Sequence, residues 1–135
     1  MLDIILIQHV NTGINLLEYQ QDHTKFNVEH SDIFSGFLNA IQSIMSNELD
    51  IGTIILISTK GKRGHNCIIV PKDPISVVIL CDQEDPIELW REFGEEIVER
   101  FLEMFGTDFN HQNVEQFKKF ADVIKEMCLD NKYCE

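Results

Sequence analysis

A nearly unbroken apolar run opens the chain, and it is the feature that most constrains the fold. Residues 2–8 read LDIILIQ, mostly Leu and Ile, whereas a strand with one solvated face would alternate apolar and polar side chains. A strand of this kind needs apolar cover on both of its faces. We therefore expect this strand to be covered on both faces.

Four further extended runs should complete an antiparallel sheet. The tripeptide Asn-Thr-Gly that ends at Gly13 tolerates positive φ, so the run at 14–20 should return beside the first strand as a hairpin. Runs at 53–59, 65–70 and 75–82 follow, and Gly and Pro residues lie between them rather than inside them. Their order predicts a meander.

Two helices are expected after the last strand. Asp85 can cap the first of them, with Pro86 at its first position and Gly106 at its end. The second should span residues 113–130. The chain of 135 residues is 44% apolar, which suffices for one domain around a single core.

A stretch without charge, residues 35–47, forms most of another expected helix, which begins at Ser31 or Asp32 after a polar loop at 21–30. One face should pack on the sheet, with Ile33, Phe34, Phe37, Leu38, Ile41, Ile44 and Met45. The other face is small or neutral polar, with Ser35, Gly36, Asn39, Gln42, Ser43, Ser46 and Asn47. Depletion of charge with retained hydrogen-bonding capacity is typical of the buried part of an interface. We expect a partner on that face; the alternative is that these side chains face water.

Composition narrows the classes of partner and compartment. The net charge of −12 disfavours nucleic acid and anionic lipid as partners. The apolar start lacks a basic region and is too short for a signal peptide, and no segment is long enough to insert into a membrane. The four cysteines have no CxxC spacing, so we expect reduced thiols in a cytoplasmic protein and no disulfide framework.

No pattern in the chain predicts catalysis, a metal or a cofactor. There is no nucleophile elbow, dinucleotide fingerprint or phosphate-binding loop, so we expect neither an enzyme nor a cofactor. His65 and Cys67 share a strand face, but nothing supplies further metal ligands. The basic loop at 60–65 is a solvated hairpin tip or a contact for an acidic partner. The glutamates of the helix after Pro86 are a solvated face or a docking surface for a basic partner.

The order of elements, β-β-α-β-β-β-α-α, together with the helix sequence DIFSGFLNAI at 32–41, resembles the longin family and its small archaeal relatives. The related roadblock family begins with an additional helix, whereas this chain begins in a strand. The resemblance implies a five-stranded antiparallel sheet in the order 2-1-5-4-3, an α+β fold. One helix would cover one face of the sheet and two helices the other.

The resemblance also implies a partner surface. In longin and roadblock assemblies, the third strand and the first helix commonly join a second copy in a ten-stranded sheet, and such platforms bind small GTPases. The implied function is a dimerising interaction module, as a homodimer or heterodimer, for small GTPases or trafficking complexes. The matching interface residues here are Phe34, Ser35, Leu38, Asn39, Gln42, Met45, Ser46, Thr53, Ile55 and Ile57.

Two other classes of protein remain open. A sensor domain of PAS or GAF type would bind a small ligand between sheet and helix, in a cavity with convergent polar groups. A profilin-like binder of cytoskeletal proteins would use the final helix and the adjacent strands.

Overall fold

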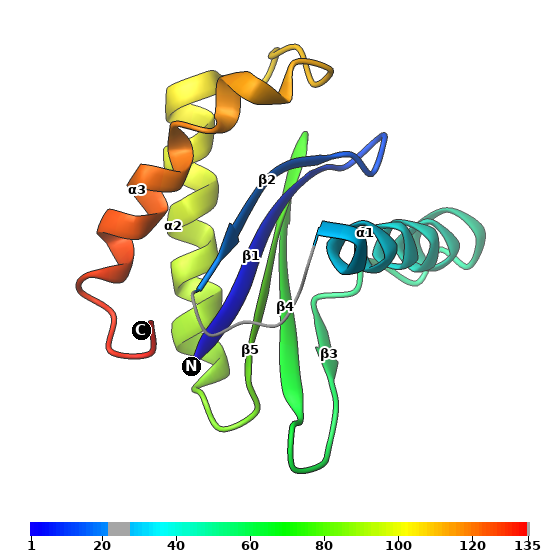
Figure 1. Cartoon of the computed structure of the whole chain (residues 1–135). Helices are drawn as coiled ribbons and strands as arrows, with labels where there is room; N and C mark the ends of the chain where they lie inside the picture. Colours follow the sequence, from blue (N-terminus) through cyan, green and yellow to red (C-terminus); the bar gives the residue numbers. More distant parts are fainter. Residues whose placement is uncertain (22–27, 135) are drawn as a thin grey trace.

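The computed structural model describes residues 1–21 and 28–134 (Figure 1). Most of the expected polar loop at 21–30 lies outside the described residues. The elements are β1 (Leu2–His9), β2 (Asn15–Gln20), α1 (Val28–Ser43), the π-helical turn η1 (Ile44–Glu48), β3 (Leu56–Ser58), β4 (His65–Lys72), β5 (Ile75–Asp82), α2 (Ile87–Phe105), the 3-10 helix η2 (Val114–Phe117) and α3 (Phe120–Cys128).

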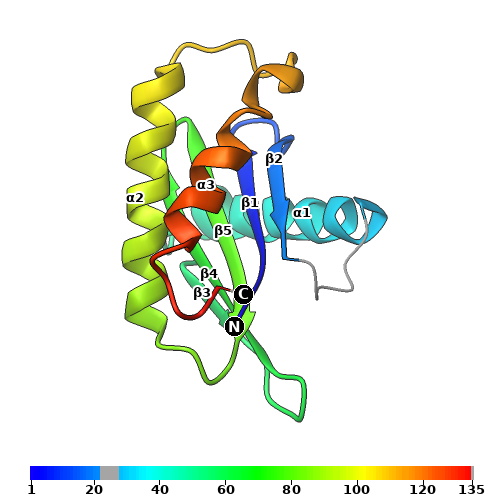
Figure 2. The ribbon, with the colours of Figure 1, turned by 60° about the vertical axis from the view of Figure 1, so that its left-hand side comes forward.

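The five strands form one antiparallel sheet in the order β2-β1-β5-β4-β3, as expected. Ile79 of β5 lies opposite Ile5 of β1 and Ile68 of β4, so β5 is central. Helix α1 covers one face of the sheet, and α2 and α3 cover the other (Figures 1 and 2). The apolar first strand thus has helices on both sides, which confirms the three-layer prediction.

The core is divided between the two faces of the sheet. The larger part lies under α2 and α3, where Trp90, Phe101, Phe117 and Phe120 are fully buried against the strands. The smaller part lies under α1 and consists of Ile4, Leu6, Leu38, Cys67, Ile69, Val78 and Leu80. Only Leu38 of α1 belongs to its fully buried set. Helix α1 is therefore held by much less apolar contact than α2.

Several expected boundaries are wrong. Helix α1 begins at Val28, so neither Ser31 nor Asp32 is its cap. The third strand is only Leu56–Ser58, the three residues that pair with β4, and not 53–59. The last expected helix is split into η2 and α3, with Phe117 and Phe120 buried on either side of the break.

Asp85 does not cap α2. The residue before the helix is Pro86, with no side-chain capping hydrogen bond. The Asp85 carboxylate is instead buried, and it accepts hydrogen bonds from the amino terminus of Met1 and from Trp90 Nε1, the latter at 3.0 Å. At the other end, Gly106 adopts a φ of +73° and ends α2 as expected.

The cysteines differ from the expectation that all four are reduced. Cys128 and Cys134 form a disulfide that closes the last turn of the described chain. Cys67 and Cys81 are free and buried in strands, and burial raises the pKa of each thiol to about 12. Two protonated thiols therefore belong to the core, whereas the other two form a covalent link.

Candidate protein interface and cavity around α1

The orientation of α1 about its own axis differs from the expected one. Ser31, Ser35 and Leu38 point to the sheet and are at most 3% exposed, whereas Ile33 and Phe37 are 66% and 54% exposed. The side expected to be polar and outward is divided: Ser35 is buried within the chain and Gln42 and Ser46 are partly buried, whereas Gly36, Asn39, Ser43 and Asn47 are exposed. The side expected to pack on the sheet is partly outward.

Polar groups on β2 explain this orientation. Ser35 Oγ donates a hydrogen bond to Asn15 Oδ1 at 2.7 Å, and Ser31 Oγ donates to Glu18 Oε1 at 3.0 Å. A buried hydroxyl without a partner costs about 1–3 kcal/mol, so these serines settle where acceptors exist. The acceptors lie 13 to 20 residues away in the sequence and could not be read from the periodicity of the helix.

Gln42 joins the other half of α1 to the segment before β3. Its Nε2 donates to the Ile54 carbonyl at 2.8 Å, and its Oε1 accepts from the Ile54 amide at 2.7 Å. The side-chain amide thereby makes the two bonds that a neighbouring strand would make. Gln42 therefore serves the fold of this chain, in addition to any role in an interface.

An apolar row remains exposed on α1, and we call it the outer stripe. It consists of Ile33, Phe37, Ala40 and Ile44, spaced four, three and four residues apart and hence on one side of the helix. Leu49, Ile51 and Ile55 follow along the chain and are also exposed. More than half of the exposed large apolar side chains of the described residues lie in this segment. Clustered exposure of this kind marks an interaction site.

Gly36 lies beside the outer stripe. A Cβ atom built on Gly36 would meet nothing within 4 Å, so close packing on the sheet does not explain this glycine. The other reading of Gly36, close approach of a partner helix, stays a prediction. An exposed glycine inside a helix costs up to about 1 kcal/mol relative to alanine.

Strand β3 is an edge strand of the sheet, with β4 as its one partner in the described part of the chain. The Ile55 carbonyl accepts a hydrogen bond from the Ile69 amide at 3.0 Å, and the Thr59 amide donates to the His65 carbonyl at 2.9 Å. The backbone N–H and C=O groups of the odd-numbered residues therefore point towards β4. In an antiparallel pair, the backbone groups of the residues in between point away from the partner strand. Gln42 occupies the outward groups of Ile54, which leaves those of Leu56 and Ser58 for another strand.

The ten residues expected at the interface divide into three groups. Ser35 and Leu38 are buried within the chain. Phe34, Gln42, Met45, Ser46 and Ile57 are partly buried, and Asn39, Thr53 and Ile55 are exposed. Ile33, Phe37 and Ile44 are not among these ten residues, because their spacing is typical of a helix face packed on a core.

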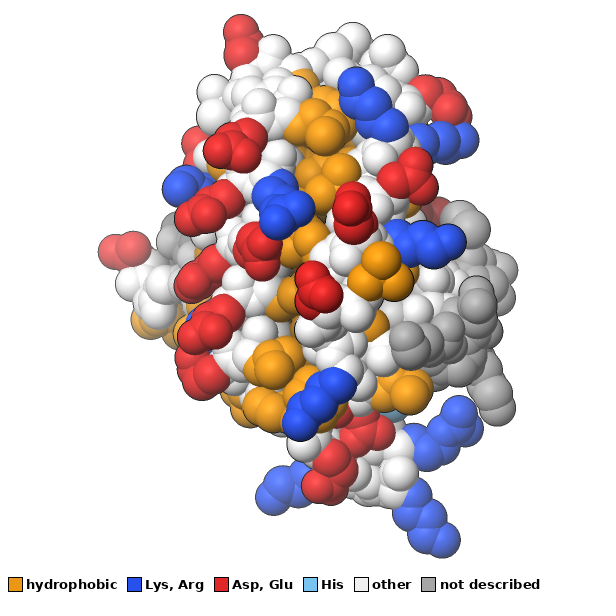
Figure 3. Space-filling model, turned by 90° about the vertical axis from the view of Figure 1, so that its left-hand side faces the viewer, with side chains coloured by type: hydrophobic (Ala, Val, Ile, Leu, Met, Phe, Trp, Pro, Cys, Tyr) orange, Lys and Arg blue, Asp and Glu red, His pale blue; other side chains and the backbone are white. Residues whose placement is uncertain are grey.

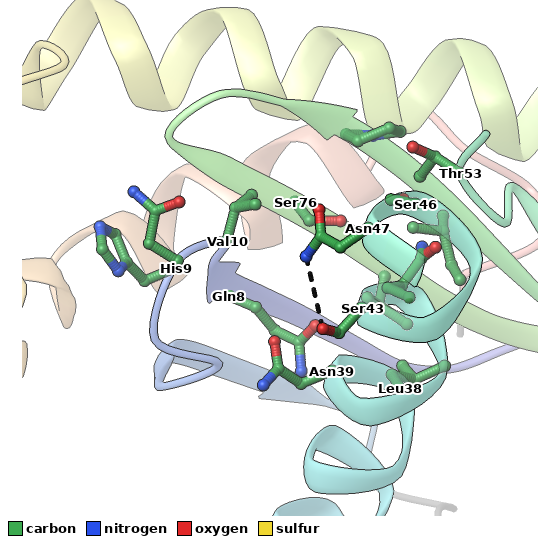
Figure 4. A pocket seen from close by; sticks show the side chains of 15 residues that line it. Gln8, His9, Val10, Leu38, Asn39, Ser43, Ser46, Asn47, Thr53 and Ser76 are labelled. Atoms are coloured by element: carbon green, nitrogen blue, oxygen red, sulfur yellow. Dashed lines mark hydrogen bonds between the residues drawn. The ribbon is translucent and has the colours of Figure 1, made fainter. Parts of the chain in front are cut away.

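A cavity of about 340 Å³ lies between the second half of α1 and the sheet (Figure 4). Its lining includes the apolar residues Leu38, Ile69 and Val78 and the neutral polar residues Gln8, Asn39, Gln42, Ser43, Ser46, Asn47, Thr53 and Ser76. Five of the residues expected at the interface therefore line this cavity: Leu38, Asn39, Gln42, Ser46 and Thr53. The neutral polar pattern of the helix corresponds in large part to the cavity wall.

The opposite side of the molecule is strongly charged. Carboxylates follow α2 in Figure 3, beside an apolar seam between α2 and α3. Arg100 pairs with Glu96 at 2.8 Å, as the spacing indicates, but most of the glutamates of α2 are exposed. Within the described residues, no helix is both long enough and apolar enough to cross a membrane.

Other candidate residues do not assemble into a reactive site. His65 Nε2 contacts Asp3 Oδ2 at 2.5 Å, whereas Cys67 belongs to the core under α1. No three metal-binding side chains come together in the described part of the chain. The lysines and the arginine of the loop at 60–65 are exposed.

Comparison with known proteins identifies the fold. No protein-family model matches the sequence, and no curated protein matches it. A Roadblock/LC7 domain from Streptomyces avermitilis has a similar structure, with a TM-score of 0.52, 10% identity, and coverage of 73% of this chain and 81% of that one. MglC from Myxococcus xanthus also matches, at a TM-score of 0.36, 12% identity, and coverage of 67% and 76%. The chain therefore has a longin/roadblock-like fold.

Proposed function

We propose that this chain is a non-catalytic interaction module that pairs with a second domain of longin or roadblock type through α1 and β3. The pair, a homodimer or a heterodimer, would serve as a platform for a small GTPase or a trafficking complex. The observation that carries the proposal is the exposed outer stripe of α1, in a chain whose strand β3 has no second pairing strand among the described residues.

The outer stripe supplies the driving force for pairing. Ile33, Phe37 and Ile44 are 66%, 54% and 46% exposed. Complete burial of such a side chain contributes about 1.5–3 kcal/mol, so burial of their exposed parts contributes about 1–2 kcal/mol each. Gly36 lets the backbone of a partner helix come close to this row.

The edge of β3 supplies the register. Leu56 and Ser58 have outward backbone groups, whereas Gln42 already fills those of Ile54. A partner strand would pair at the two free positions, and this arrangement would continue the sheet into the second domain. Ile55, one of the ten expected interface residues, lies between Ile54, which Gln42 binds, and Leu56, which is free to pair.

The platform role rests on the likeness of fold, together with the implication of the longin resemblance. Helix α2, whose glutamates form the acidic face, lies on the opposite side of the sheet from α1 (Figures 1 and 2). Pairing through α1 would therefore leave that face free for a further partner. The acidic face would bind a basic surface of that partner, and salt would weaken this contact because it screens exposed charges.

Light scattering after size exclusion tests the pairing. We expect the wild-type chain, alone or mixed with its partner domain, to form dimers that Phe37→Glu dissociates, because the change places a charge in the apolar interface. Met104→Glu is the matched control, because Met104 is 46% exposed on α2, on the other side of the sheet. Equal effects of the two variants would refute the proposed surface.

Binding of GTPases is a separate experiment. The immobilised chain is offered a panel of small GTPases loaded with GDP or GTP. Retention of one GTPase in one nucleotide state, lost at Phe37→Glu and kept at Met104→Glu, supports a platform that depends on pairing. Cosedimentation with actin filaments in place of GTPase binding would favour the profilin-like alternative.

A further inference from the structure

The cavity between α1 and the sheet has a wall chemistry that differs from the rest of the protein. One residue in four of the chain is charged, yet none of the 15 residues that line the cavity is Asp, Glu, Lys or Arg. Amide and hydroxyl side chains reach it from β1, α1, η1 and β5 (Figure 4). Each of these groups can donate or accept hydrogen bonds without a net charge.

The floor of the cavity contains a buried amide that the described residues leave incompletely satisfied. Gln8 is 6% exposed, and the only hydrogen bond of its side chain to the described residues is a long one, from Nε2 to Asn15 Oδ1 at 3.5 Å. Ser76 lies directly opposite Gln8 in the β1–β5 pair, so both side chains project from the same face. Along β1, Ile4 and Leu6 precede Gln8 on that face and pack under α1. A buried amide in the next position is costly unless something else binds it.

The opposite wall is formed by the last turns of the helix. The chain changes from α to π geometry at Ile44, and this carries Ser46 and Asn47 over the cavity. Such π-helical turns are frequent at functional sites. The Asn39 side chain packs against Gly13 of the β1–β2 turn, where a Cβ atom built on Gly13 would lie 2.8 Å from Asn39 Cγ. The glycine therefore allows the Asn39 amide to sit at the mouth.

The lining selects one class of ligand. An anionic ligand would need a Lys or Arg partner, and none lines the cavity. A flat aromatic ligand would need a ring to stack on, but the one aromatic side chain in the lining, His9, is stacked on His111 with centroids 4.4 Å apart. Hydroxyl groups suit a wall of amides and hydroxyls, and an apolar ring face suits the floor of Leu38, Ile69 and Val78.

We infer that this cavity binds an uncharged polyhydroxylated molecule of about the size of a monosaccharide, with Gln8 and Ser76 at its floor and Asn39 and Asn47 at its rim. The volume of about 340 Å³ lies at the small end of ligand sites. The inference does not depend on the proposed pairing, because every lining residue belongs to one chain. Its rim lies on α1 beside the outer stripe, so a ligand would also stiffen the helix that carries that stripe.

Titration by NMR tests the inference with named probes. D-glucose, D-ribose and myo-inositol are added to the 15N-labelled full chain, and glucose 6-phosphate serves as the charged counterpart of glucose. We expect at least one neutral probe to shift the side-chain amide signals of Gln8 and Asn39 saturably, with a dissociation constant of about 1 mM or lower. If glucose is that probe, glucose 6-phosphate should bind at least tenfold more weakly.

Variants distinguish this site from weak binding elsewhere. Gln8→Leu continues the apolar face of β1 into the cavity and should weaken binding by at least tenfold, and Ser76→Val does the same if the first variant fails to fold. Gln112→Leu, at an exposed glutamine beyond α2, should bind as the wild type does. Repeating the titration in Phe37→Glu separates ligand binding from pairing. Absence of saturable shifts with all three neutral probes, or unchanged binding in both cavity variants, overturns the inference.

Discussion

The double hydrogen bond between Gln42 and Ile54 makes a specific prediction about stability. Gln42→Met keeps the length and helix propensity of the side chain but removes both bonds, of 2.8 and 2.7 Å. At about 1 kcal/mol per bond, the free energy of unfolding should fall by about 2 kcal/mol. For a chain of this length the melting temperature should fall by about 7 °C.

Gln42→Glu adds a dependence on pH that a packing defect would lack. A carboxylate still accepts from the Ile54 amide, but it has no hydrogen to donate to the Ile54 carbonyl and its negative charge repels that oxygen. The free energy of unfolding at neutral pH should therefore fall by more than in Gln42→Met. At pH 4 the protonated fraction of the introduced carboxyl donates to that carbonyl, so the difference in free energy of unfolding between Gln42→Glu and the wild type should become smaller.

The assay is urea unfolding at one fixed, low protein concentration, because pairing would itself stabilise the fold. Gln112→Met, at an exposed glutamine, is the control. If Gln42→Met unfolds within about 0.5 kcal/mol of the wild type, the bonds to Ile54 do not hold α1 to the β3 segment.

Three further predictions concern other parts of the molecule. Gly36→Ala should raise the free energy of unfolding of the unpaired chain by up to about 1 kcal/mol, and with it the melting temperature, because an added Cβ atom would meet nothing within 4 Å. A lower melting temperature would show that the added methyl group clashes with another part of the chain. Burial and then the neighbouring His111 lower the pKa of His9 below 6.5, so the contribution of His9 to stability is complete above pH 6.5 and is lost as the pH falls through 6.5 to the lower folded-state value. Urea unfolding between pH 5 and 8 should therefore show a smaller loss of stability in His9→Asn than in the wild type, and equal losses would exclude His9 as the cause. Thiol titration of the unfolded, unreduced chain should detect Cys67 and Cys81 alone; four reactive thiols would contradict the Cys128–Cys134 link.

The sheet and the acidic helix could be predicted from the sequence because their signals are local. The apolar run of β1, the turn at Gly13 and the stop at Gly106 each depend on neighbouring residues. Strand β5 covers Ile75–Asp82, as expected from its apolar run. The order of the strands came from the longin resemblance, and the structure agrees with it.

The rotation of α1 about its axis could not be predicted, because it depends on distant polar partners. Asn15, Glu18 and Ile54 draw Ser35, Ser31 and Gln42 inward, and this turns Phe37 outward. Apolar periodicity assumes that the sheet offers only apolar contact. Of the seven small or neutral polar residues that suggested a partner surface, five line a cavity within the chain: Asn39, Gln42, Ser43, Ser46 and Asn47. The disulfide was missed because Cys128 and Cys134 lack CxxC spacing, and only the turn after α3 brings them together.

Amide hydrogen exchange at Leu56 and Ser58 tests the proposed pairing through α1 and β3 most directly. Both amides face away from β4, so in the unpaired chain they should exchange at the rate of an exposed backbone. We predict that they become protected as protein concentration rises into the range where dimers form, and that Phe37→Glu abolishes this protection while Met104→Glu preserves it. Fast exchange of Leu56 and Ser58 in a sample shown to be fully dimeric would contradict the continuous sheet and place the interface elsewhere.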